Sequence, residues 1–202
     1  MYTVELLTAE QLADASGRLA GLLVDTVDGG ASLGFLAPLD HEAAAAWWRS
    51  LVPDVAAGRL LLWVARAGED GGNGTDAGGA GTEDAGGAGR IAGTVQLRPA
   101  TPANGRHRGE VAKLMVDPRD RGQGLAGRLL DALESAAAGR GIRLLVLDTE
   151  TDSPAERMYE AAGWTRVGTV PDYATDPAGV PHPTTVFFKA SAPAVPSPVS
   201  VG

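Results

Sequence analysis

The stretch of residues 110–127 constrains the fold more than any other part of this chain. An apolar run in it ends at Asp117-Pro118, because proline cannot donate a sheet hydrogen bond. A glycine-rich loop follows, and helically spaced leucines then continue to Gly139. This order predicts a strand, a loop and a helix N-terminus, whose free N–H groups and dipole bind phosphate. Arg121 adds a fixed positive charge beside that site.

Two other kinds of phosphate loop compete for the same segment. Gly122, Gly124 and Gly127 also satisfy the dinucleotide pattern G-x-G-x-x-G, and Asp148 lies about where a ribose-binding acid would follow. In a dinucleotide fold, however, the first glycine follows its strand almost directly, and a long series of βαβ units comes after it. Here five residues intervene, and only one such unit remains. A P-loop is excluded because no Gly-Lys-Ser/Thr ends the loop.

Two motifs in the chain resemble those of one enzyme superfamily. Residues 121–126, Arg-Gly-Gln-Gly-Leu-Ala, resemble the signature Q/R-x-x-G-x-G/A of the GNAT superfamily of N-acetyltransferases. Residues 152–164 resemble its second signature, N-x-x-A-x-x-L/F-Y-x-x-x-G-F, with Asp152 in place of the usual asparagine. Four further segments are similar to the tabtoxin resistance acetyltransferase and its relatives: 25–35, 56–63, 110–116 and 147–150. The resemblance covers nearly the whole chain outside one insert and the tail.

The resemblance implies a fold and a co-substrate. The fold is α/β, with a mixed sheet of about seven strands, about four flanking helices and one parallel β-α-β unit. That unit would bind acetyl-CoA through its pyrophosphate, and the pantetheine arm would pair with main-chain groups where two central strands splay apart. No metal is expected. The implied cofactor-binding residues are Met115, Val116, Arg121, Gly122, Gln123, Gly124, Leu125, Ala126 and Gly127.

Apolar periodicity and capping residues predict the individual elements. The expected strands are residues 2–7, 59–67, 90–98, 110–116, 141–148, 164–170 and 184–189. The first helix begins at a capping box formed by Thr8 and Gln11, and the second begins after Asp40. A third spans residues 127–139, and a fourth begins at Ser153-Pro154. A long, proline-rich loop is expected over residues 171–183.

Composition changes abruptly at two places. Residues 68–89 contain ten glycines in 22 residues and no Val, Ile, Leu or aromatic residue, so burial cannot offset their ordering entropy. We expect a disordered insert at a hairpin tip there, and a disordered tail over residues 190–202. Residues 1–189 then form a single acetyltransferase domain. The insert also carries five of the eight net negative charges, which leaves a nearly balanced folded surface.

Composition also excludes several classes of protein. The chain has no cysteine and three scattered histidines, which argues against disulfides and zinc sites. Its net charge of −8 argues against general nucleic-acid binding. No leader opens the chain and no apolar run approaches ~20 residues, so we expect a soluble cytoplasmic protein away from membranes. A monomer or a homodimer is expected.

Acetyl transfer from a thioester to an amine needs a base and a proton donor. Glu110 opens one central strand and Asp148 closes the next, and family acids at these positions act as bases. The sequence leaves open which acid acts, whether both share the task, or whether either is an ordinary strand-end charge. Tyr159 matches a family tyrosine near the thioester sulfur, although a packed helix aromatic is the alternative. Phe35 and His182 are weaker candidates for the acceptor pocket.

The favoured function is acetyl-CoA-dependent N-acetylation of a small-molecule amine, EC 2.3.1.-, possibly of a toxin or antibiotic and so linked to resistance. The alternative is a catalytically weak sensor or interaction module that binds acyl-CoA on the same fold. The presence of Glu110, Asp148 and Tyr159 together favours the enzyme.

Overall fold

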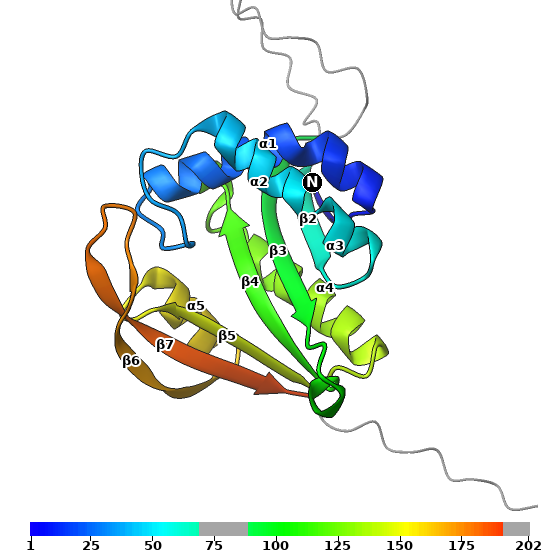
Figure 1. Cartoon of the computed structure of the whole chain (residues 1–202), viewed down its shortest axis with the longest axis vertical. Helices are drawn as coiled ribbons and strands as arrows, with labels where there is room; N and C mark the ends of the chain where they lie inside the picture. The colour runs from blue at the N-terminus through cyan, green and yellow to red at the C-terminus, as the bar shows by residue number, and fades with distance from the viewer. Residues whose placement is uncertain (69–88, 192–202) are drawn as a thin grey trace, which may run out of the picture.

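A computed structural model describes residues 1–68 and 89–191 (Figure 1). Within these residues the chain forms one seven-stranded sheet of order β1-β2-β3-β4-β5-β7-β6. The strands are β1 (Tyr2–Leu6), β2 (Leu61–Ala67), β3 (Ile91–Pro99), β4 (Arg108–Val116), β5 (Leu144–Glu150), β6 (Thr165–Thr175) and β7 (Pro181–Ala190). Neighbouring strands are antiparallel except β4 and β5, which are parallel. The predicted α/β fold with one parallel unit is confirmed.

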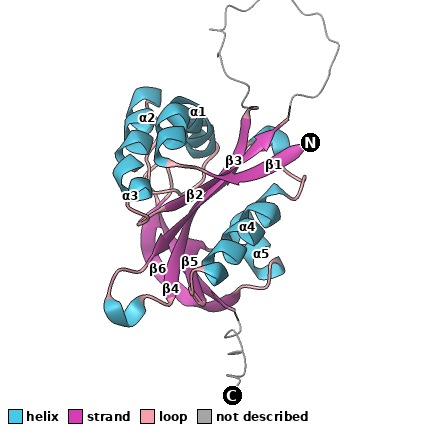
Figure 2. Cartoon of the chain, turned by 90° about the vertical axis from the view of Figure 1, so that its right-hand side faces the viewer, coloured by secondary structure: helices cyan, strands magenta, loops and turns pink. Residues whose placement is uncertain are grey.

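Helices cover both faces of this sheet (Figure 2). One face carries α1 (Ala9–Asp28), α2 (His41–Ser50) and the short α3 (Val52–Ala56), and the other carries α4 (Leu125–Gly139) and α5 (Pro154–Ala161). The predicted caps are present, since Thr8 and Gln11 form a capping box and Asp40 and Ser153 accept from helix amides. Two 3-10 turns, Ala103–Gly105 and Pro118–Asp120, flank β4. None of the described helices is long and apolar enough to cross a bilayer.

The sheet separates two hydrophobic cores. On the α1 side, Trp48 is fully buried against leucines of α1 and β2. On the α4 side, Phe187 is fully buried with leucines of α4 and β5. Side chains alternate between the faces of a strand. Since Leu145 and Leu147 of β5 enter the α4-side core, Asp148 of the same strand points to the opposite side.

The parallel strands β4 and β5 stay paired over only three positions. Their register joins Arg108 to Leu144 and ends with Glu110 opposite Val146. Beyond that pair the strands diverge, and Figure 1 shows them meeting at one end and opening toward α1. We call this opening the splay. On its other edge β4 remains paired with β3, but a bulge interrupts the register and Lys113 adopts a φ of 52° there.

The predicted loop over residues 171–183 is wrong. β6 continues through Pro171 to Thr175, and β7 already begins at Pro181. Proline is tolerated because β6 is the edge strand and its register shifts between Val170 and Ala174, so Pro171 occupies a bulge.

Smaller shifts move the two candidate acids into their strands. Asp148 lies two residues before the end of β5, and Glu110 is the third residue of β4. The start of β5 moves because Ile142 still bonds back to the helix, its amide donating to the Ala137 carbonyl at 3.0 Å. Helix α4 begins two residues earlier than predicted, at Leu125.

The predicted insert falls mainly on residues 69–88, which lie outside the described residues, as does the tail from 192 onward. The ends of the insert are adjacent, because the Ala67 amide donates to the Arg90 carbonyl at 2.9 Å. The first tail residue, Ala190, belongs to β7, and Ser191 donates to the Arg143 carbonyl at 3.0 Å. The single domain over residues 1–189 stays a prediction.

Candidate active site

The phosphate loop, residues 117–127, presents a row of unused backbone donors. Gly122 and Gly124 have φ values of 77° and 72°, and α4 starts at the next residue. Among the described residues, no acceptor bonds the N–H groups of residues 122–127. A Cβ added at Gly122, Gly124 or Gly127 would meet nothing within 4 Å, so the space above the loop is open. These donors, the helix dipole and Arg121 suit a pyrophosphate.

A buried ionic network holds the start of this loop against the start of β3. Asp117 and Asp120 are only 4% and 5% exposed. Arg90 donates one N–H to each of them, both at 2.9 Å, and the Tyr2 hydroxyl also donates to Asp120 at 2.8 Å. Hydrogen bonds from Arg119 and the charge of Arg90 lower the pKa of Asp117. Arg90 could not be identified from the sequence, since its role depends on β3 lying beside the end of β4.

Met115 and Val116 lie on β4 immediately before the loop. Met115 is buried in the α1-side core and Val116 packs against the α4-side core. Their side chains are therefore occupied, and only main-chain groups at this edge are left to contact a ligand. Beyond Glu110 the edge of β4 that faces β5 has no partner strand in the described chain. The contact of a pantetheine arm with this edge, which the resemblance implies, stays a prediction.

The two candidate acids share one side of the sheet. By strand alternation, Glu110 and Asp148 both point away from the α4-side core. Neither carboxylate forms a hydrogen bond or ion pair with another described residue. Although Asp148 is exposed as a whole residue, partial burial of its carboxyl raises the pKa, and the positive charge of Lys113 opposes that shift. Asp148 thus combines an available carboxylate with increased basicity.

Tyr159 lies on α5 and is 7% exposed. Its ring packs against Trp164 and Phe187, with centroid separations of 5.8 Å and 6.2 Å. In the described part of the chain no hydrogen bond is formed by its hydroxyl. Burial raises the pKa of Tyr159, and the negative charge of Asp148 raises it further. The phenol is therefore a protonated donor near neutral pH and cannot serve as a base.

Lys113 is a site residue that the sequence analysis did not identify. Its Nζ donates to the Leu33 carbonyl at 2.6 Å and lies 5.6 Å and 5.7 Å from the ring centroids of Phe35 and Trp47. Phe35, predicted for the acceptor side, thus belongs to this cluster and stacks edge-on against Trp47. A signal was present in the sequence, because Lys113 is the only cation in an otherwise apolar run.

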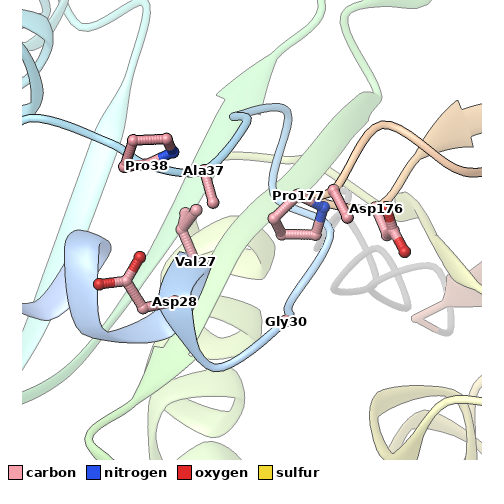
Figure 3. A pocket seen from close by; sticks show the side chains of 8 residues that line it. Val27, Asp28, Gly30, Ala37, Pro38, Asp176 and Pro177 are labelled. Atoms are coloured by element: carbon pink, nitrogen blue, oxygen red, sulfur yellow. The ribbon is translucent and has the colours of Figure 1, made fainter.

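An open cleft of about 450 Å³ is lined by other residues of the segment that carries Leu33 and Phe35. It separates the end of α1 and residues 29–40, which we call the acceptor loop, from the tip between β6 and β7 (Figure 3). Its lining residues are Val27, Asp28, Gly30, Ala37, Pro38, Asp176, Pro177 and Ala178. The Ala37 amide donates to the Pro177 carbonyl at 2.8 Å and joins its two walls.

The remaining candidate, His182, lies outside that lining. Its Nε2 is 3.3 Å from Asp176 and its Nδ1 is 4.0 Å from Glu150. It therefore supports the hairpin tip and contacts neither Asp148 nor Tyr159. Within the described ranges no group of His, Asp and Glu side chains could hold a metal ion.

Comparisons with solved structures identify this architecture in other proteins. The protein yncA from Salmonella typhimurium, solved with its cofactor acetyl-CoA, is 17% identical with a TM-score of 0.67, covering 98% of this chain and 99% of that one. A ribosomal-protein-alanine N-acetyltransferase from Brucella melitensis is 19% identical with a TM-score of 0.65, covering 94% and 99%. A protein assigned as a phosphinothricin N-acetyltransferase is 17% identical with a TM-score of 0.67, covering 94% and 98%.

The sequence itself matches a family across the functional region. The model of the Acetyltransferase (GNAT) family matches residues 56–164. This range extends from the end of α3 through the phosphate loop, both candidate acids and Tyr159 to Trp164. Because the match covers more than half of the 202 residues, the chain belongs to the acetyltransferase (GNAT) family.

Proposed function

We propose that this protein transfers the acetyl group of acetyl-CoA to the amine of a small molecule. The observation that carries the proposal is the phosphate loop, which directly follows β4 and in which six amides have no acceptor among the described residues. Asp148 lies on the neighbouring strand β5, and Tyr159 lies on the helix that follows it. The fit of the loop to a pyrophosphate supports acetyl-CoA as the co-substrate, as does the cofactor of yncA. A sensor that merely binds acyl-CoA would need the loop but not the acid and the phenol.

The proposed reaction uses each group once. Asp148 accepts a proton from the acceptor amine, directly or through water, and the neutral nitrogen attacks the acetyl carbonyl. The new C–N bond forms, and the nitrogen of the tetrahedral intermediate releases its second proton to solvent. The C–S bond then breaks, and the leaving thiolate takes the phenolic proton of Tyr159. Solvent reprotonates Tyr159 and takes up the proton held by Asp148, so the products are an acetamide, free CoA and one proton. Glu110, at the last β4–β5 pair before the strands diverge, is the alternative or shared base.

The size of the cleft supports a small acceptor. About 450 Å³ between the acceptor loop and the hairpin tip suits a metabolite or drug-sized molecule. One structural neighbour is named for acetylation of a small molecule, phosphinothricin, whereas the Brucella enzyme is named for acetylation of a ribosomal protein. Detoxification of a toxin or antibiotic, a cytoplasmic location, and a monomeric or homodimeric state belong to the same proposal.

The binding half of the proposal is tested by replacing a loop glycine. Gly124→Val should weaken acetyl-CoA binding at least about tenfold in calorimetry, because a β-branched side chain would fill the open space above the amides. Gly141→Val is a matched control, since Gly141 has nearly the same φ of 74°, equally open surroundings and a position at the far end of α4. Both variants should lose similar stability, and only the first should lose affinity. Equal acetyl-CoA affinity in folded Gly124→Val would contradict the site.

The acceptor half is tested by measuring CoA release with two classes of amine, small amino compounds and peptides. We expect turnover with phosphinothricin or other small amino compounds to exceed turnover with a peptide bearing an N-terminal alanine. The reason is the limited size of the cleft, whose two walls are joined by the Ala37–Pro177 hydrogen bond. A preference for the peptide would redirect the acceptor class to proteins. Tight acetyl-CoA binding with no transfer to any amine would favour the sensor.

A further inference from the structure

Lys113 has an unusual backbone for its residue type. Its φ of 52° lies in the left-handed region, which lysine rarely adopts. The residue occupies the β4 bulge, between the pairs Ala112–Gln96 and Met115–Thr94. Bulges redirect side chains, and strained residues persist where the surrounding structure enforces them. Here the bulge brings the Lys113 side chain to the acceptor loop.

The ammonium group of Lys113 is enclosed by that loop and α2. It donates to the Leu33 carbonyl at 2.6 Å and lies within cation–π range of both Phe35 and Trp47. A lysine ammonium has three N–H donors, and this contact uses one of them. Burial lowers the pKa of Lys113, which indicates that the cage excludes much of the solvent.

Three charged side chains act on this ammonium. Asp148 of β5 and Glu110 of β4 favour its charged form, whereas Arg98 of β3 opposes it. The negative charge of Asp148 also acts on the phenol of Tyr159 on α5. The acceptor loop contributes a carbonyl and an aromatic ring to the cage. Lys113 thus acts on Asp148 while its ammonium is held by the acceptor loop and α2.

We propose that Lys113 is a positioning residue that fastens the acceptor loop to β4 and holds a positive charge on the side of the sheet to which Asp148 points. The inference rests on the proposed function. The loop is held at its far side by two bonds to the hairpin, Ala37 to Pro177 and Ser32 Oγ to the Thr175 carbonyl at 3.0 Å. Lys113 supplies the bond that joins the loop to β4. The same side chain therefore acts on a loop that lines the cleft and on the carboxylate of the proposed base.

Two readouts on the free protein test this proposal without any acceptor. Hydrogen exchange of residues 29–40 reports the latch, and carbon NMR titration of the Asp148 carboxyl reports the charge. Lys113→Met keeps a long, unbranched side chain, and it meets the same cost of a positive φ as lysine does. It removes the charge and the hydrogen-bond donor. Lys113→Arg restores the charge. Ser32→Ala is the matched control, because it removes a loop bond on the opposite side without changing any charge.

In Lys113→Met, exchange of the acceptor loop should accelerate about tenfold, as expected for loss of one charge-assisted hydrogen bond. The Asp148 titration should move to higher pH, because the opposing positive charge is gone. Lys113→Arg should return the titration toward the wild-type position. Ser32→Ala should accelerate exchange without moving the titration. With an accepted amine, Lys113→Met should raise the acceptor KM more than it changes the acetyl-CoA affinity.

Either unchanged exchange or an unmoved Asp148 titration in Lys113→Met would overturn the proposal. So would a titration that moves equally in Ser32→Ala, since the loop position alone would then explain it. If the wild-type enzyme transfers acetyl to no amine, the proposed function fails, while exchange and titration still decide the role of Lys113. Thermal unfolding of each variant shows that the compared proteins are folded.

Discussion

Asp148→Asn should lower kcat/KM for the acceptor amine by about 10²–10⁴-fold, the range typical of a lost general base. The amide is nearly the same size as the carboxylate but cannot accept the proton of an ammonium ion. An unperturbed primary amine is mostly protonated near pH 7, so the loss should be largest at low pH. Raising the pH supplies neutral amine from solution and should partly rescue the variant. A pH–rate profile measures both effects.

The direction of the Asp148 pKa shift allows a measurement of stability to distinguish the loss of a base from a structural defect. Burial raises the folded-state pKa, so ionised Asp148 is less favourable in the native protein than in the unfolded chain. Above that pKa the charge therefore reduces stability, and the reduction disappears as the pH falls through it. Asp148→Asn should consequently unfold at or above the wild-type temperature at neutral pH. A loss of rate with a lower unfolding temperature would contradict the role as base.

Glu110→Gln provides the comparison between the two acids. Glu110 lies where the β4–β5 pairing ends and the splay begins. If Asp148 alone is the base, Glu110→Gln should retain most activity. The fall of its rate toward low pH should then follow that of the wild-type enzyme. Comparable losses in both variants would show that the carboxylates share the task. Wild-type rates in both, between about pH 6 and pH 9, would leave positioning of the amine as the source of catalysis.

The parts of the molecule that depend on local chemistry could be predicted from the sequence. Helix starts at Thr8, Asp40 and Ser153 follow from side chains that bond amides a few residues away. The phosphate loop is equally local, since glycines and a following helix suffice to define it. Its geometry agrees with that expectation, including positive φ values at Gly122 and Gly124.

The features that were missed depend on contacts between distant segments. Arg90 becomes important only because β3 places it against Asp117 and Asp120. Lys113 reaches Leu33, 80 residues away, through a bulge that no periodicity signals. The loop predicted from Pro171 onward is wrong, because an edge strand with a bulge accommodates that proline. In each case tertiary structure decides what a local pattern leaves open.

The acceptor is the least predictable feature for a related reason. The phosphate loop and the splay form from continuous strands and one helix, whereas the cleft forms between the acceptor loop and a hairpin tip. Neighbours at 17% and 19% identity, named for a small molecule and for a ribosomal protein, share the same fold. A shared fold therefore does not identify the amine, and we propose that the loop residues determine it.

Tyr159→Phe should lower kcat by about 10²–10⁴-fold while leaving acetyl-CoA affinity unchanged, as expected for a lost general acid. Phenylalanine keeps the ring contacts with Trp164 and Phe187, and the missing hydroxyl bonds no described residue. Stability should therefore change little. Because burial holds the pKa of Tyr159 well above neutrality, the loss should be similar between about pH 6 and pH 9, without rescue at high pH. Wild-type turnover, or an equal loss of acetyl-CoA affinity, would contradict the assignment.

The coupling between Tyr159 and Asp148 gives this prediction its sharpest form. Negative charge on Asp148 raises the pKa of the phenol. When Asp148 takes the proton of the amine, that charge disappears, and the phenol becomes a stronger acid as the thiolate departs. The two groups then act as a unit, so the double variant should lose less rate than the product of the two single losses. Strictly multiplicative losses would show that the acid and the phenol act independently.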